Sequence, residues 1–153
     1  MGMLTSARVE IAAPAADVFS WLVDPVRLTA WAGGPGGMPE DGSVLRAGWT
    51  STFDNPPIGP MTLEVIVYEP PTRLEYRTTY PGGDSFATFL LSEGEGATTL
   101  VMEGDTDWAR PEGTEGEAVD AALEGQAAGT QALMQQAAEA SVRKLKVLIE
   151  SAI

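Results

Sequence analysis

The chain has 153 residues, 44% of them hydrophobic and 20% charged, which is typical of one globular domain with a single sizeable core. Nine basic and 22 acidic residues give a formal net charge of −13, which repels phosphate backbones and anionic membrane surfaces. The chain contains no histidine and no cysteine, so imidazole and thiolate chemistry and disulfides are excluded. We therefore expect no nucleic-acid partner, no metal site and no cofactor.

The first part of the chain predicts one strand and two short helices. Residues 4–12 alternate apolar and charged side chains, which indicates a half-buried strand. In "APAADVFSWLVDPVRLTAW", Asp24 and Pro25 end one helix and begin the next. The segment "MGMLTSARVEI" lacks the basic and apolar regions of a signal peptide, and no apolar run is long enough to span a membrane. We expect a cytoplasmic protein without membrane insertion.

Alternation with a period of two follows, which predicts strands near residues 43–53, 61–69, 73–80, 84–92 and 97–107. Short turn-prone segments separate them, which indicates an antiparallel meander. Because Arg73, Glu75 and Arg77 should face water, the alternate positions should face inward. The inward set is Leu45, Ala47, Trp49, Ser51, Phe53, Leu63, Val65, Val67, Leu74, Tyr76, Thr78, Tyr80, Ala87, Phe89, Leu91, Leu100, Met102 and Thr106.

A long helix is predicted to begin between Gly113 and Ala118 and to run to the end of the chain. One of its faces changes in character along its length. The far end carries large side chains, whereas the near end carries small, soft or polar ones. A helix packed on a solid core would carry large residues throughout, so the thin half predicts a cavity beside it. The face comprises Ala127, Thr130, Gln131, Met134 and Ala138 in its thin half and Val142, Leu145 and Ile149 in its bulky half.

Several local patterns, in this order, resemble the START/SRPBCC helix-grip superfamily. They are Val9-x-Ile11-x-Ala13-Pro14, Val18-Phe19, Leu22, Asp24-Pro25, Leu28 and Trp31, then "EPPTRLEYR", "GATTL" and "RKLKVLIES". The superfamily includes polyketide cyclase/dehydratase-like proteins and domains related to activators of a heat-shock chaperone ATPase. The resemblance implies an α+β fold with two short helices after the first strand. A curved antiparallel sheet of about six or seven strands would wrap on the long C-terminal helix, and residues 1–153 would form a single helix-grip ligand-binding domain.

The candidate ligand-binding residues are those expected on the inner surface of the sheet, at its mouth or on the thin half of the helix. Each of them has a plainer alternative role in core packing. Glu103, Asp105 and Asp107 alternate along one strand, which is typical of a solvated outer face rather than of a cation site. The candidates are Trp31, Trp49, Tyr76, Thr78, Phe89, Met102, Ala127, Thr130, Met134 and Ala138.

Three functions remain open at this point. The leading interpretation is binding of a small apolar or aromatic molecule, lipid- or polyketide-like, in a cavity between the sheet and the C-terminal helix. The second is a metal-independent enzyme of the polyketide cyclase/dehydratase type, in which Tyr76, Tyr80 or Ser51 handles protons. The third is a protein-interaction or chaperone-cofactor domain, or a homodimer formed through exposed sheet surface.

Overall fold

The structure is a computed structural model that describes residues 2–32, 45–55, 59–81, 83–108 and 117–152. It contains one antiparallel sheet and three helices, so the predicted α+β class is confirmed. The elements in chain order are β1 (Gly2–Ile11), α1 (Ala15–Val23), α2 (Pro25–Ala32), β2 (Thr50–Asn55), β3 (Gly59–Glu69), β4 (Arg73–Tyr80), β5 (Gly83–Gly94), β6 (Ala97–Trp108) and α3 (Glu117–Ser151).

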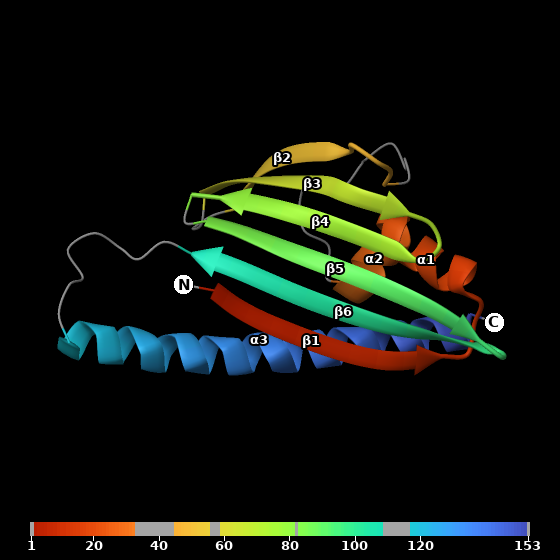
Figure 1. The fold of residues 1–153 in the computed structure, drawn as a ribbon. Helices are drawn as coiled ribbons and strands as arrows, with labels where there is room; N and C mark the ends of the chain where they lie inside the picture. Colours follow the sequence, from red (N-terminus) through yellow and green to blue (C-terminus); the bar gives the residue numbers. More distant parts are fainter. Residues whose placement is uncertain (1, 33–44, 56–58, 82, 109–116, 153) are drawn as a thin grey trace.

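The six strands lie in the order β1-β6-β5-β4-β3-β2, so strands β2 to β6 form the predicted meander and β1 joins the sheet beside β6. The long helix α3 runs alongside β1, and α1 and α2 lie behind one end of the sheet (Figure 1). The first turns of α3 extend past the end of the strands in the same view. This arrangement is a helix-grip type of fold, with the helix packed along the β1 side of the sheet.

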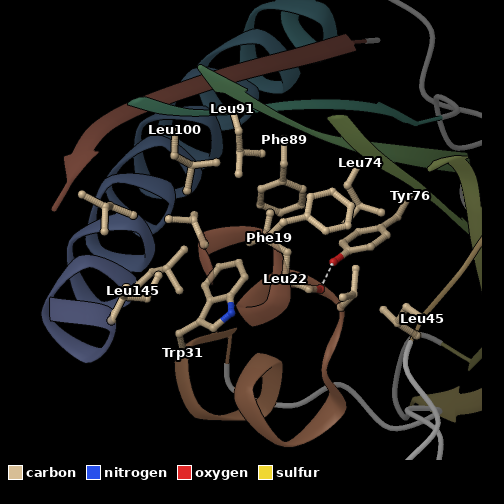
Figure 2. Packing of buried hydrophobic residues seen from close by; sticks show 14 of the residues in the cluster. Phe19, Leu22, Trp31, Leu45, Leu74, Tyr76, Phe89, Leu91, Leu100 and Leu145 are labelled. Carbon is tan, nitrogen blue, oxygen red and sulfur yellow. Dashed lines mark hydrogen bonds between the residues drawn. The ribbon is translucent and has the colours of Figure 1, made fainter. Parts of the chain in front are cut away.

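We call the face that carries Leu74, Phe89 and Leu100 the inner face, because all three side chains are buried there. It packs on α1, which buries Val18, Phe19 and Leu22. Figure 2 shows aromatic and aliphatic side chains from the sheet and all three helices meeting in one core. The bulky end of α3 joins this core through Leu145 and Ile149, which are 0% and 2% exposed. The sequence predicted this packed end correctly.

The free edge of β1 is covered by polar side chains of α3. Gln131 donates to the Leu4 carbonyl oxygen at 2.8 Å, and Lys146 donates to the Glu10 carbonyl oxygen at 2.7 Å. Further contacts made by Gln135 and Glu150 satisfy the backbone groups of Ser6 and the amide of Ala12. An open strand edge presents unpaired backbone groups that invite pairing with another chain. In this protein, side chains of α3 form hydrogen bonds with these backbone groups instead.

The predicted alternation is confirmed on β4, where Leu74 and Tyr76 are 0% and 9% exposed and Arg77 is exposed. It is wrong at Val67, because a β-bulge lies between Val65 and Val67. The extra residue shifts the pairing, so Val67 pairs with the outward-facing Glu75. Tyr68 instead reaches the inner face, where its ring meets Phe19 edge-on at 5.6 Å.

The strand predicted over residues 43–53 is shorter than expected. Residues 45–49 form a turn, and the strand begins at Thr50. Leu45 is fully buried and its amide donates to the Val23 carbonyl oxygen, but Ala47 is exposed, which corrects its inward assignment. Gly48 has a φ of 77°, a conformation that suits a glycine in a turn. The Gly-rich segment at residues 33–37 lies outside the described residues.

Candidate functional site

The inner face of the sheet changes from bulky to small and polar along its strands. At the end near α1 its side chains are buried aliphatic and aromatic groups. Toward the other end, beside the near half of α3, Ala87 and Gly104 are only half-buried. Four half-buried hydroxyl residues follow at the next inward positions. We call them the hydroxyl band: Ser51 on β2, Thr78 on β4, Ser85 on β5 and Thr106 on β6.

The register of the sheet places the members of the hydroxyl band in one row. Thr78 is the direct partner of Ser85, which in turn is the partner of Thr106. Ser51 belongs to the same row, with Leu63 between it and Thr78. The hydroxyl oxygens of Ser85 and Thr106 lie 3.1 Å apart, within hydrogen-bond distance. A polar surface on four strands therefore borders the apolar core.

In the row next to the hydroxyl band, the positions on β5 and β6 carry the small residues Ala87 and Gly104. A β-carbon added at Gly104 would overlap the hydroxyl oxygen of Thr5, its partner on β1. The lack of a side chain at this position therefore allows Thr5 to lean across β6. On the side toward the core, no bulky side chain of β5 or β6 therefore lies beside Ser85 and Thr106, whereas Tyr76 lies beside Thr78 on β4.

Three of the predicted ligand-binding residues lie together in the core. Trp31 and Phe89 meet edge-on with ring centroids 6.0 Å apart, and Tyr76 meets Phe89 at 5.5 Å. The indole nitrogen of Trp31 donates to the Trp21 carbonyl oxygen at 2.9 Å. All three side chains are at most 9% exposed, so they are part of the packed core, which borders the hydroxyl band at Tyr76, two residues before Thr78 on β4.

The hydroxyl group of Tyr76 already has a partner. It donates to the carbonyl oxygen of Leu22 at 2.9 Å, as the dashed line in Figure 2 shows. Burial raises the pKa of Tyr76 well above its usual range, because the phenolate would be removed from water. Of the three candidate proton-transfer residues, Tyr80 and Ser51 are half-buried, whereas Tyr76 is committed to the last turn of α1.

The predicted residues on α3 differ in their surroundings. Ala138 is 8% exposed and packs with Ala7 and Val142 in a small cluster. Met102 is partly buried against this cluster and against the main core. Met134, one turn before Ala138, is half-buried. The side chains of Ala127 and Thr130 lie outside the described residues, and Trp49 is half-buried against the main core.

The sequence did not predict a concave region that lies on the outer face of the sheet. It has a volume of about 740 Å³. Strand alternation places Glu75, Glu103 and Asp105 on this face, where they give the hollow a negative charge. No group of residues suited to hold a metal ion occurs within the described part of the chain, these acids included. The hollow is lined by Leu4, Thr5, Ser6, Glu75, Phe86, Thr88, Glu103, Gly104, Asp105 and Gln135.

Two members of the hydroxyl band, Ser85 and Thr106, were not among the predicted site residues. Thr106 was expected to face inward, and Ser85 has the same alternation as Ala87 and Phe89. Their pairing across the strands was the missing information, because it depends on the register between β5 and β6.

Residues 4–150 match the family model described as "Polyketide cyclase / dehydrase and lipid transport". The chain belongs to this family. The match extends from β1 to the last turn of α3, so it includes the inner face and its hydroxyl band. No curated protein matches the chain.

Solved structures from other proteins share the fold of this chain. A protein from Rhodobacter sphaeroides is 25% identical with a TM-score of 0.63, and the match covers 99% of this chain and 94% of that protein. The Aha1 dimer from Colwellia psychrerythraea gives 13% identity and a TM-score of 0.64, with 96% of each chain covered.

DynU16, a protein from the dynemicin biosynthetic locus, is 22% identical with a TM-score of 0.51. The match covers 90% of this chain and 49% of DynU16, so the chain spans about half the length of that protein. At this identity the likeness concerns the fold. Among the described residues of this chain, no helix is long and apolar enough to cross a membrane.

Proposed function

We propose that this protein, as a single domain over residues 1–153, binds a small apolar or aromatic molecule, lipid- or polyketide-like, on the inner face of the sheet. The site adjoins the near half of α3 and has the hydroxyl band as one wall. The packed core that contains Trp31, Tyr76 and Phe89 borders the site and makes its surroundings apolar. Family membership supports a small hydrophobic ligand as the partner.

The observation that carries the proposal is the partial burial of the inner face beyond Tyr76. The side chains of Thr78, Ser85 and Thr106 face the same side as the core but remain half-buried, whereas Leu74 and Leu100 are fully covered. Ligand sites are mostly apolar with a few placed polar groups, and this part of the inner face has both. The outer hollow is a weaker candidate for an apolar molecule, because three carboxylates border it.

A titration with a neutral solvatochromic dye such as Nile red tests the proposal, because the dye emission rises and shifts to shorter wavelength in an apolar site. Two tryptophan substitutions on β5 then distinguish the two faces. Ser85→Trp fills the inner surface, whereas Thr88→Trp fills the outer hollow three residues further along the same strand. We expect Ser85→Trp to abolish dye binding and Thr88→Trp to leave it within about twofold of the original protein.

If Thr88→Trp abolished dye binding and Ser85→Trp did not, the ligand would be assigned to the outer face and the proposal would be contradicted. Thermal melts of both variants are needed, so that loss of binding is read only in folded protein. Native mass spectrometry of the purified protein, followed by organic extraction, would then identify a co-purifying molecule directly.

A cyclase/dehydratase-type reaction is the second candidate, favoured by the family description and by the half-buried hydroxyl of Ser51 beside the proposed site. The chain has no imidazole or thiol, so proton transfer would fall to carboxylate, hydroxyl or lysine groups or to bound water. Product analysis with candidate polyketide substrates tests this candidate, and Ser51→Ala should then lower turnover without lowering dye binding. A homodimer remains a separate prediction, which light scattering after size-exclusion chromatography tests.

A further inference from the structure

Three members of the hydroxyl band lie side by side on adjacent strands. Thr78 pairs with Ser85 and Ser85 with Thr106, so neighbouring positions are about 5 Å apart across the sheet. The oxygens of Ser85 and Thr106 share one hydrogen bond of 3.1 Å. Over the described part of the chain, no group forms a hydrogen bond with the hydroxyl of Thr78.

These hydroxyl groups retain hydrogen-bonding capacity that a ligand can use. Each hydroxyl has one hydrogen to donate and two lone pairs to accept. The bond between Ser85 and Thr106 uses only one hydrogen of the pair, and the hydrogen of Thr78 is unused within the described residues. A pure hydrocarbon lying on this surface would displace water from the hydroxyls without replacing its hydrogen bonds, which is costly.

The inner surface around the hydroxyl band is also free of charge within the described strands. The charged residues of β4 to β6 at this level, such as Arg77 and Glu103, alternate onto the outer face. Arg77, for example, lies 3.7 Å from Asp84 on that face, at a distance typical of a salt bridge. No described cation on the inner face would therefore neutralise an anionic ligand, and the net charge of −13 repels one.

We infer that the inner surface selects a neutral ligand carrying at least two oxygen atoms, which are bound by the hydroxyl groups of Thr78, Ser85 and Thr106. The inference rests on the proposed function and narrows its ligand class. It separates hydroxylated or carbonyl-rich ring compounds from hydrocarbons and from ionised fatty acids. The hydroxyl row fixes the orientation of the ligand, and its apolar part lies on the half-buried inner surface at Ala87 and Gly104, next to the core.

Three fluorescent probes of nearly equal shape test the inference: 1,3-dihydroxynaphthalene, naphthalene and 2-naphthoate, each titrated at pH 7. The dihydroxy compound should bind most tightly, about tenfold or more tighter than naphthalene, because it can form at least two additional hydrogen bonds. The carboxylate should bind most weakly of the three.

Two threonines of β4 provide a matched pair of variants. Thr78→Val keeps the shape of the side chain but removes its hydroxyl, whereas Thr79→Val makes the same change on the exposed outer face. Thr78→Val should weaken binding of the dihydroxy probe by about three- to tenfold and leave binding of naphthalene unchanged or slightly tighter. Thr79→Val should affect neither probe.

The inference is overturned if naphthalene binds the original protein as tightly as the dihydroxy compound, or if Thr78→Val weakens both probes equally. It is also overturned if Nile red binds and no naphthalene compound does. In these cases the proposed function still stands. Failure of Nile red and of all three naphthalene probes overturns the proposed function together with the inference.

Discussion

The side-chain amide of Gln135 binds both backbone groups of Ser6. Its oxygen accepts from the Ser6 amide at 3.0 Å, and its nitrogen donates to the Ser6 carbonyl oxygen at 2.6 Å. This is the pair of hydrogen bonds that a neighbouring strand would supply at a strand edge. A glutamine on a helix therefore takes the place of a seventh strand beside β1.

Replacing Gln135 by Leu removes both hydrogen bonds, so we expect the free energy of unfolding to fall by about 1–3 kcal/mol. Amide exchange at Ser6 should become faster, whereas Ala12, whose amide donates to Glu150, should keep its protection. Hydrogen exchange followed by NMR measures both sites. Gln136→Leu is the control on the exposed side of the helix, and equal effects of both variants would contradict a specific role for Gln135.

Tyr76→Phe should destabilise the protein by about 1–2 kcal/mol at pH 7 in urea unfolding. The Leu22 carbonyl oxygen lies in the last turn of α1, and the amide of Val26 donates to Asp24 rather than back to Leu22. The Tyr76 hydroxyl therefore supplies its hydrogen bond. Tyr68→Phe, which keeps a ring against Phe19, should cost less.

The Tyr76 difference should also depend on pH. Because burial raises the pKa of Tyr76 in the folded state above its unfolded value, the hydroxyl stabilises the protein fully below about pH 10. Above this pH the unfolded chain ionises first, so the stability gap between the original protein and Tyr76→Phe should narrow. A gap that stays constant up to pH 11 would argue against a buried, protonated Tyr76.

Glu150→Gln should destabilise the protein at pH 7 and lose its effect in acid. Hydrogen bonds from Lys146 and from the Ala12 amide lower the pKa of Glu150, outweighing the opposing effect of desolvation. A carboxylate with a lowered folded pKa contributes stability above the unfolded value of about 4.3, and this contribution disappears as the pH falls through the folded pKa. Urea midpoints at pH 7 and pH 3 measure the difference, with Glu95→Gln at an exposed turn as the control.

Two substitutions compare how tightly the thin and the bulky half of the inward face of α3 are packed. Leu145→Ala empties a fully buried position and should cost about 2–5 kcal/mol. Ala138→Leu adds bulk where Ala138 packs on Ala7, and we expect a loss of about 1–3 kcal/mol. Ala140→Leu on the exposed side should be nearly neutral. Thermal melts distinguish the cases, and an unchanged melting temperature for Ala138→Leu would indicate free space at that position.

Alternation along the strands predicted the inner face well on β4, where the side chains of Leu74 and Tyr76 are apolar and buried and Arg77 on the other side is charged. It was wrong at Val67, since a bulge is set by the pairing of two strands and leaves no mark on the period of one. The same limit applies to the hydroxyl band. Ser85 became a candidate only when register placed it between Thr78 and Thr106.

The role of α3 was predicted in part for a similar reason. The bulky stripe through Leu145 and Ile149 indicated burial, and both are buried. Gln131 was assigned to the apolar face, although it is exposed and donates to Leu4. Helical spacing identifies which side chains share a face. It does not identify the hydrogen-bond partner of a long polar side chain at the margin of that face, because the partner is a backbone group of the neighbouring strand.

The position of β1 has a consequence for the order of events during synthesis. One edge of β1 pairs with β6 and the other is closed by α3, and both of these partners are translated later than all the other elements. Strand β1 is therefore synthesised before the other described strands and stays unpaired until nearly the whole domain has been made. Such long-range closure slows folding and prolongs the exposure of a pairing-competent edge. During this interval the nascent chain is most vulnerable to association with a second copy, and a chaperone that shields β1 would be most useful then.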